Sequence, residues 1–278
     1  MKTTVLLSLF LMLCLSVCEA QKAFDVAVIG KGQPVFLFPG FGCTGEVWNE
    51  VVADLSKEYQ CHVFTFAGFG GVPAIEGPWL ATIKDQVIAY TRTNKIKKPT
   101  LIGHSLGGTL SLWLASLEPM MFKSVIAVDA LPASAALMIP NYKGEPIAYD
   151  NPQSKMMLAM DSASFAGMNA QSVPFMCKNQ EKQKVLINWM NMADRKTYVY
   201  GYIDMLNLDL RESLANIKAP VFVLGAANPD RATVEKTYNQ QYAKLPPAKI
   251  VYAENSAHFI MYDQPKWLME KIQEYIRQ

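Results

Sequence analysis

The sequence predicts an α/β fold, with a mostly parallel twisted sheet that carries helices on both faces. The first observation is that β-branched, apolar runs alternate with segments of helix length along the chain. The second is that several runs are almost continuously apolar, as strands buried on both faces of a parallel sheet are. The third is composition. The 278 residues are 51% hydrophobic and 18% charged, which provides a large core and excludes a mainly disordered chain.

The N-terminal segment, residues 1–20, has the pattern of a cleaved secretory signal peptide. Lys2 precedes a stretch, residues 5–17, that is apolar except for two serines, and Ala20 ends a small-residue cleavage pattern. The stretch is too short to span a bilayer, and no second long apolar run follows. We expect cleavage after Ala20 and a secreted or periplasmic mature chain. A buried apolar element and lipoprotein processing at Cys18 are the lesser alternatives.

The remaining chain contains runs with strand composition and segments with helical periodicity. The expected strands are 25–29, 34–38, 62–67, 100–103, 125–129, 221–225 and 249–253. The expected helices are 47–58, 80–93, 106–117, 234–244 and 265–277. The last helix shows the signal clearly, because Trp267, Leu268, Ile272, Tyr275 and Ile276 fall on one face.

One long segment, residues 132–215, interrupts this alternation. It lacks strand-like runs and holds nine of the fifteen methionines, and four prolines make its first part loop-like. We expect a helical cap inserted into an α/β core formed by residues 21–131 and 216–278. The methionines either line an adaptable apolar pocket or fill gaps in a small helical core, and both interpretations fit.

Charge and cysteine content exclude several kinds of site. With 26 basic and 24 acidic residues the formal net charge is +2, and no basic stripe marks a nucleic-acid surface. Three cysteines, Cys43, Cys61 and Cys177, remain after cleavage, and their spacing matches no metal or redox motif. A Cys43–Cys61 bridge and buried free thiols both fit. We therefore expect no metal, no cofactor and no nucleic-acid partner.

The main chemical signal is Gly-His-Ser-Leu-Gly at residues 103–107, which lies between an expected strand and an expected helix. In that context the pattern predicts a nucleophile elbow, because a turn this tight needs glycines on either side of the serine. Ser105 would be exposed at the helix N-terminus, where the helix dipole and the Leu106 N–H favour negative charge. Ser105 is therefore the candidate nucleophile, and Leu106 N–H is a candidate oxyanion donor.

A second oxyanion donor is expected in the glycine-rich turn that follows the strand at 34–38. This turn reads Pro-Gly-Phe-Gly-Cys at residues 39–43 and leaves room for a substrate carbonyl. Phe41 N–H is the candidate donor. The alternative is a strand-to-helix turn without a chemical role.

The base is sought among the three histidines of the chain. His258 lies in a loop between the last expected strand and the last expected helix, where it can reach the serine. His62 begins a strand and His104 lies beside the nucleophile, so structural roles are expected for both. His258 is therefore the candidate general base.

Three motifs in this order resemble the α/β-hydrolase superfamily: Phe-Pro-Gly-Phe-Gly at 38–42, Gly-His-Ser-Leu-Gly-Gly at 103–108 and Ser-Ala-His-Phe at 256–259. The resemblance covers essentially the whole mature chain and is strongest to capped, esterase-like serine hydrolases. It implies a Ser-His-acid triad and places the cap at 132–215.

The acid departs from the pattern of this family. The family usually carries it shortly after the next-to-last strand, where this chain has Asn228, followed by Pro229 and Asp230. Some members carry the acid after the strand that follows the nucleophile helix, and the matching residue is Asp129. Asp129 is the leading candidate and Asp230 the alternative, while an arrangement built on Asn228, or one with no acid, stays open.

These observations predict an exported serine hydrolase that cleaves a small-molecule ester, thioester or lactone with an apolar acyl or ring portion. The reaction would pass through a covalent acyl-enzyme. The main rival is a binding or sensing protein on the same fold with little or no turnover, which Asn228 favours. Carbon–carbon bond hydrolysis also remains open, because a fold alone does not determine chemistry.

Overall fold

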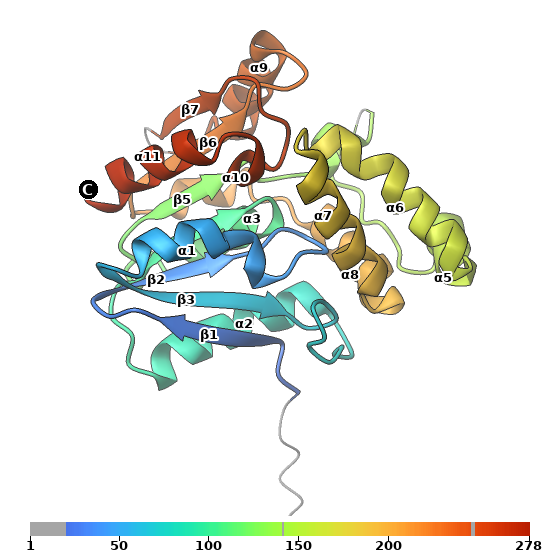
Figure 1. The fold of residues 1–278 in the computed structure, drawn as a ribbon, viewed down its shortest axis with the longest axis horizontal. Coiled ribbons are helices and arrows are strands. Elements are labelled where there is room, and N and C mark those ends of the chain that lie inside the picture. Colours follow the sequence, from blue (N-terminus) through green and yellow to red (C-terminus); the bar gives the residue numbers. More distant parts are fainter. Residues whose placement is uncertain (1–20, 141, 246–247) are drawn as a thin grey trace, which may run out of the picture.

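The computed structural model describes residues 21–140, 142–245 and 248–278 of the chain. The signal peptide predicted for residues 1–20 lies outside the described residues. The fold centres on a seven-stranded sheet with the order β1-β3-β2-β4-β5-β6-β7 (Figure 1). The edge strand β1 runs antiparallel to β3, and all the other neighbouring strands are parallel. The predicted fold class is confirmed.

The strands agree closely with those expected. They are β1 Phe24–Ile29, β2 Gln33–Phe38, β3 Tyr59–Phe66, β4 Thr100–His104, β5 Val125–Val128, β6 Val221–Ala226 and β7 Lys249–Ala253. The helices outside the insertion are η1 Gly45–Trp48, α1 Asn49–Leu55, α2 Trp79–Thr93, α3 Leu106–Leu117, α9 Arg231–Gln241, α10 Ile260–Asp263 and α11 Pro265–Ile276. Among the described residues, none of the helices has both the length and the apolar character needed to cross a bilayer.

Apolar side chains fill both faces of the sheet, which explains the continuous apolar runs. In β2, Phe36 joins the core beneath α2 and α3, whereas the next residue, Leu37, joins the core beneath α1 and α11. Both side chains are completely buried. Burying such a side chain contributes about 1.5–3 kcal/mol, so successive strand residues stabilise opposite faces of the sheet.

Two helix boundaries differ from those expected, for local reasons. The helix expected at 47–58 begins as the 3₁₀ turn η1 and ends at Leu55. The helix expected at 234–244 begins earlier, at Arg231, because the Asp230 carboxylate accepts the Thr233 N–H and caps α9.

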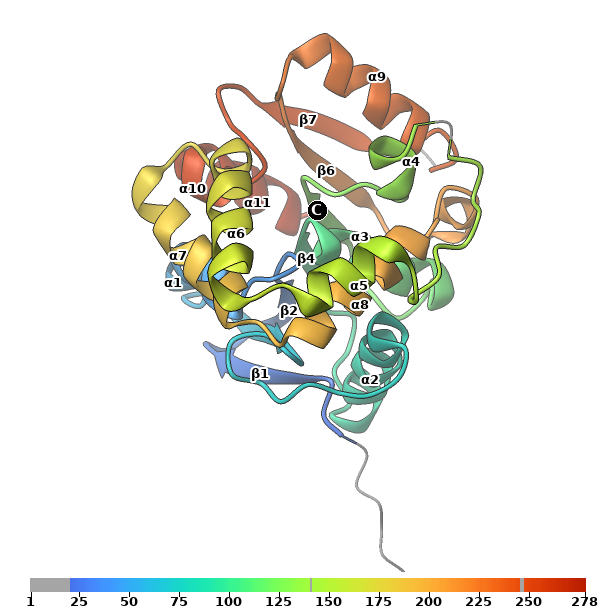
Figure 2. The same ribbon diagram turned by 90° about the vertical axis from the view of Figure 1, so that its right-hand side faces the viewer.

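The described part of the segment between β5 and β6 contains helices joined by loops. These helices are α4 Ala135–Met138, α5 Pro152–Ala159, α6 Ser162–Met176, α7 Gln180–Met192, α8 Arg195–Asn207 and η2 Ser213–Asn216. Figure 1 shows α5, α6, α7 and α8 beyond the carboxyl ends of the parallel strands. Figure 2, which looks onto the insertion, shows α4 beside β6 and β7, with α6 and α7 on the other side of the strand ends.

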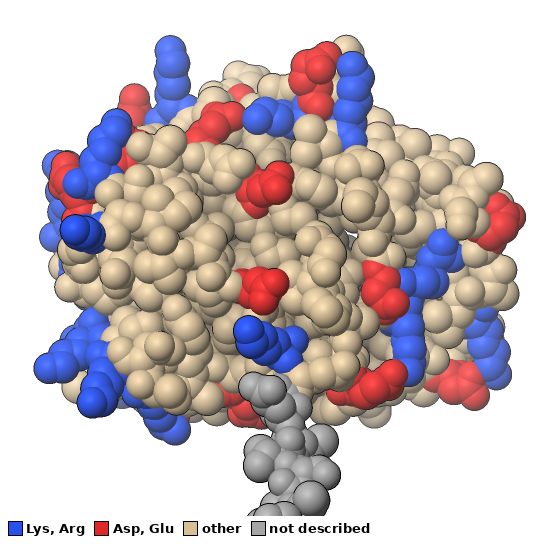
Figure 3. Space-filling model, turned by 60° about the horizontal axis from the view of Figure 1, so that its bottom comes forward, with Lys and Arg blue, Asp and Glu red and all other residues tan. Residues whose placement is uncertain are grey.

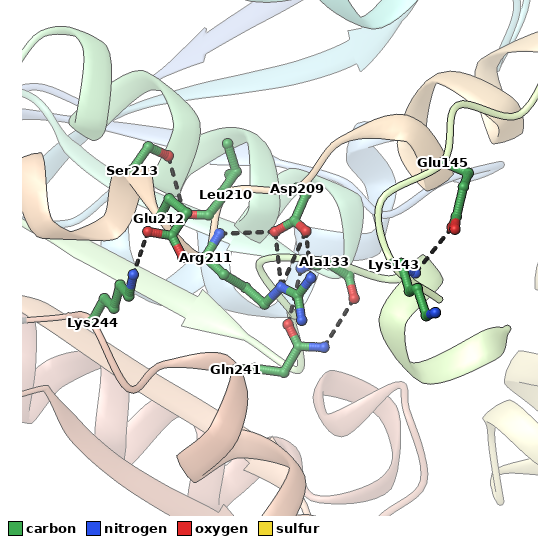
Figure 4. Close-up of polar contacts among 10 residues, drawn as sticks. All are labelled: Ala133, Lys143, Glu145, Asp209, Leu210, Arg211, Glu212, Ser213, Gln241 and Lys244. Atoms are coloured by element: carbon green, nitrogen blue, oxygen red, sulfur yellow. Dashed lines mark hydrogen bonds and ion pairs between the residues drawn. The ribbon is translucent and has the colours of Figure 1, made fainter. Parts of the chain in front are cut away.

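The two ends of the insertion are hydrogen-bonded to each other and to α9. The buried Gln241 side chain accepts the Ala133 N–H at 3.1 Å and donates to the Ala133 carbonyl at 2.9 Å (Figure 4). Leu210 N–H, near the other end, donates to the Pro132 carbonyl at 3.0 Å. The base of the insertion is therefore a hydrogen-bonded junction with the core.

The three cysteines in the described part of the chain, Cys43, Cys61 and Cys177, are buried and free, so the Cys43–Cys61 bridge that the sequence allowed is absent. Burial raises the pKa of the Cys43 thiol to about 12 and that of Cys61 to about 11. Protonated, enclosed thiols are poor nucleophiles, and these residues act as small core side chains.

Charged side chains of both signs are separated by broad uncharged areas on the face in Figure 3. Many are paired at the surface, as in the contact between Arg92 and Glu118 at 2.6 Å. Exposed pairs of this kind contribute little stability.

Candidate active site

Ser105 lies on a sharp turn between β4 and α3, as the elbow pattern predicts. Its backbone has φ 51° and ψ −119°, a strained conformation for a residue with a side chain. A Cβ on Gly103 would lie 2.1 Å from the Gly107 carbonyl oxygen, and one on Gly107 would lie 2.4 Å from the Phe38 carbonyl oxygen. Only glycine fits at these two positions, which explains the residue pattern around the serine.

The proposed oxyanion donors flank this serine. Leu106 is the first residue of α3, so its N–H has no partner within the helix. The turn that carries Phe41 passes close by, since a Cβ on Gly40 would lie 3.3 Å from Ser105 Cβ. Within the described residues, neither the Phe41 N–H nor the Leu106 N–H has a protein acceptor. Both N–H groups therefore stay candidate donors to an oxyanion.

The candidate base is paired with a carboxylate. His258 lies between β7 and α10, and its Nδ1 is 2.6 Å from Asp129 Oδ2. This contact keeps the proton on Nδ1 and leaves Nε2 as the acceptor. Ser105 and His258 line the same cavity, although no hydrogen bond joins their side chains in the described part of the chain. Catalytic hydrogen bonds are often long before substrate binds.

Asp129 directly follows β5 and is firmly held. Its backbone has φ 43°, and its N–H donates to the Leu224 carbonyl at 2.7 Å. Its Oδ1 accepts the Ala226 N–H and the Tyr238 hydroxyl, each at 2.8 Å. All the strong contacts of this carboxylate therefore serve to orient it toward His258.

The other acid candidates lie elsewhere. The exposed Asp230 carboxylate caps α9, and the Thr233 hydrogen bonds lower its pKa below the usual value. Asn228 is exposed and lines the cavity. The structure thus brings Asp129, and neither Asp230 nor Asn228, to the imidazole.

The remaining histidines have structural contacts. Buried His104 pairs through Nε2 with the His258 carbonyl oxygen at 3.0 Å, which joins the elbow to the histidine loop. Burial, and then the neighbouring His258, hold the His104 pKa well below its ordinary value, so this ring is neutral. His62 contacts the Tyr90 hydroxyl at 2.8 Å.

A cavity of about 330 Å³ contains Ser105, Asp129 and His258. One wall comes from the insertion and is apolar, with side chains from Leu137, Met138, Met176 and Met205. The lining also includes small polar side chains, which are Ser134 before α4, Asn228 after β6, and Thr233 and Thr237 from α9. Met190 instead packs in the core against Gly42. Some methionines of the insertion therefore line the pocket and others fill the core.

Two polar residues at the site were not predicted. Tyr238 holds Asp129, as described above, and Asp263 links the histidine loop to the insertion. Asp263 Oδ2 accepts the Ala257 N–H at 2.8 Å, and its Oδ1 accepts the N–H groups of Lys178 and Asn179 at 2.9 and 3.1 Å. Neither residue stands out in the sequence, because both act on backbone or side-chain groups that are distant along the chain.

Comparisons with known proteins place the sequence among hydrolases. The model of the alpha/beta hydrolase family matches residues 35–271. A pimeloyl-[acyl-carrier protein] methyl ester esterase from Aliivibrio fischeri is 23% identical over 84% of this chain and 90% of its own length. Another, from Aeromonas salmonicida, is 34% identical, but the match spans only 43% of that protein and 40% of this chain.

Solved structures show the same fold. The enol-lactonase from Burkholderia xenovorans superimposes with a TM-score of 0.75 at 16% identity, over 92% of this chain and 96% of its own. An esterase from Exiguobacterium antarcticum gives 0.76 at 17% identity, over 92% and 96% of the two chains.

Proposed function

Because this chain belongs to the alpha/beta hydrolase family, we propose that it is a serine hydrolase that cleaves carboxylic esters, thioesters or lactones. The observation that carries the proposal is the contact of 2.6 Å between Asp129 and His258, in the cavity that also contains Ser105. It supplies an oriented base beside a strained serine.

In the proposed reaction, Ser105 Oγ attacks the carbonyl carbon while His258 Nε2 takes the hydroxyl proton. The oxyanion is stabilised by the N–H groups of Phe41 and Leu106, and Asp129 stabilises the imidazolium. Collapse of the intermediate breaks the carbon–oxygen or carbon–sulfur bond, and the leaving group takes the proton from His258. Water then attacks the acyl-enzyme by the same steps, which releases the acid and restores Ser105.

The walls of the cavity support a neutral, largely apolar acyl or ring portion. Its lining includes no lysine or arginine among the described residues, and the Asp129 carboxylate is already engaged by His258 and Tyr238. At roughly 30 Å³ for each water molecule in the liquid, the volume equals about eleven waters. We therefore expect a short or medium-length acyl group beside the apolar wall formed by α4, α6 and α8.

Two similar proteins support ester or lactone cleavage, because one is named a methyl ester esterase and the other an enol-lactonase.

The rival hypothesis, a binding protein without turnover, drew its support from Asn228 in place of the usual acid. That support is lost because Asp129 pairs with His258 instead.

Export is also proposed, on the pattern of residues 1–20. Expression of the full chain in a bacterial host, followed by fractionation and N-terminal sequencing, tests it. Mature protein beginning at Gln21 outside the cytoplasm is expected, and full-length protein retained in the cytoplasm contradicts export.

The activity is tested first with a fluorophosphonate probe. An activated Ser105 displaces fluoride from phosphorus and His258 takes the serine proton, which leaves a stable adduct on Oγ. We expect stoichiometric labelling on the peptide that contains Ser105, and none in Ser105→Ala. Folded wild-type protein that is not labelled would contradict the proposed function. A positive result is followed by kcat/KM measurements on p-nitrophenyl esters of increasing acyl length.

A further inference from the structure

We propose that Tyr238 is a positioning residue that fixes the Asp129 carboxylate for its contact with His258. The inference rests on the proposed function and concerns the acid of that same site. It is carried by the hydroxyl of Tyr238, which lies 2.8 Å from Asp129 Oδ1.

The two carboxylate oxygens of Asp129 have separate partners. Oδ1 accepts the Ala226 N–H at the end of β6 and the Tyr238 hydroxyl from α9, and Oδ2 faces His258 Nδ1. If Oδ1 accepted only the Ala226 N–H, the carboxylate could still rotate about the bond that joins it to Cβ. The second donor, Tyr238, removes that freedom and fixes the direction in which Oδ2 points.

Tyr238 is itself rigidly held. Its side chain is 5% exposed, and its ring stacks on Tyr242 at 5.8 Å and meets Tyr252 edge-on at 5.6 Å. Tyr242, the residue directly after α9, donates its hydroxyl to the Ala130 carbonyl at 2.7 Å, and Gln241, the last residue of α9, holds Ala133. The C-terminal part of α9 and the residue after it thus hold the chain from Asp129 to Ala133, and Tyr238 holds the acid at its beginning.

The protonation of Tyr238 suits this role. Burial, and then the charge of Asp129, raise the pKa of Tyr238 well above its ordinary value. The phenol therefore keeps its proton across the pH range of an activity assay and remains a hydrogen-bond donor. A donor to the carboxylate stabilises its negative charge and reduces its pull on the His258 proton.

Other groups that titrate or carry charge surround the pair but are unchanged by a substitution at position 238. The His104 ring lies 4.6 Å from the His258 ring and is neutral. The others are Tyr242 directly after α9, Tyr252 from β7 with Arg231 over its ring, and Asp263 from α10. Any change of pH profile between Tyr238→Phe and the wild type is thus assigned to the lost hydroxyl.

The test measures the rate of fluorophosphonate labelling of Ser105 between pH 5 and pH 9 in the mature protein, in wild type, Tyr238→Phe and Tyr242→Phe. In Tyr238→Phe the carboxylate loses a donor and attracts the imidazolium form of His258 more strongly. We expect the acid limb, the low-pH part of the pH–rate profile in which labelling is lost, to move up by about 0.5–1 pH unit. We expect the maximal labelling rate to fall about tenfold.

The matched control, Tyr242→Phe, removes a hydroxyl from an equally buried tyrosine that donates to the Ala130 carbonyl and not to the Asp129 carboxylate. It is expected to lower the melting temperature while its acid limb stays at the wild-type pH. An effect of Tyr238 through helix packing alone would lower stability in both variants and shift neither limb.

A second variant, close to tyrosine in shape and expected to shift the acid limb in the opposite direction, keeps the inference testable if Tyr238→Phe does not fold. Site-specific 3-fluorotyrosine at position 238 is a more acidic and stronger donor, so the acid limb is expected to move to lower pH. An acid limb that stays at the wild-type pH in the folded variants, or shifts equally in Tyr242→Phe, overturns the inference. Absence of wild-type labelling would instead contradict the proposed function, so the two failures are distinguishable.

Discussion

Replacing Asp129 by asparagine tests the assigned acid with the least structural disturbance. In Asp129→Asn the amide oxygen can take the place of Oδ1 and accept the Ala226 N–H and the Tyr238 hydroxyl, both 2.8 Å away in the wild type. The amide nitrogen then occupies the position of Oδ2, which lies 2.6 Å from His258 Nδ1. Two donors cannot face each other there, so Nδ1 must become the acceptor and Nε2 must carry the proton.

An imidazole with its proton on Nε2 cannot accept the proton of Ser105. We therefore expect kcat for ester hydrolysis to fall about 10⁴-fold, as when a triad acid is replaced by its amide, with little change in KM. At 1.36 kcal/mol for each tenfold change, this equals about 5.4 kcal/mol of lost transition-state stabilisation. The assay is the steady-state hydrolysis of a p-nitrophenyl ester at the pH optimum, with circular dichroism to confirm the fold.

The matched control is Asp230→Asn. Asparagine caps a helix as well as aspartate does, so α9 is retained and activity within about twofold of wild type is expected. A rate for Asp129→Asn within tenfold of wild type would refute the reasoning, as would a large loss in Asp230→Asn.

Three further predictions concern the elbow, the cavity and the buried histidine. Gly107→Ala should lower the free energy of unfolding by about 3 kcal/mol or more in urea titrations, because its Cβ would lie 2.4 Å from the Phe38 carbonyl oxygen. Gly167→Ala, in open space on α6, should instead raise it by about 0.5–1 kcal/mol. Met205→Phe should narrow the cavity and reduce kcat/KM for an octanoyl ester relative to an acetyl ester by about tenfold, whereas Met156→Phe, at an exposed site outside the cavity, should not. Because the pKa of His104 is depressed in the folded state, the unfolded chain binds more protons below about pH 6.5. The unfolding free energy should therefore decrease as the pH falls below that value, and His104→Asn should flatten this decrease; an unchanged slope would contradict it.

Much of the fold follows from local sequence patterns. The strands were predicted because the sheet buries both faces, so that neighbours such as Phe36 and Leu37 are both apolar. Ser105 and His258 were predicted because each has a recognisable place after a strand. The glycines around Ser105 carry information of their own, since backbone contacts at Gly103 and Gly107 exclude every larger residue.

The acid could not be decided from the sequence, because Asp129, Asn228 and Asp230 all follow strands. The choice depends on the backbone of Asp129, with φ 43°, and on donors at Ala226 and Tyr238 that are far away along the chain. Such contacts form only after the strands are assembled in order. For the same reason, the roles of Tyr238 and Asp263 had no sequence signal.

The junction between the core and the insertion has a consequence for how this protein can diversify. The segment from Asp129 to Ala133 leads into the cap, yet Tyr238, Gln241 and Tyr242 tie it to the core. Alterations in the helices beyond Ala133 are thereby separated from the residue that orients the base. The part of the pocket lining that comes from the cap is thus encoded apart from the residues that orient the base, and substitutions in the cap can change which substrates fit while the acid stays in place.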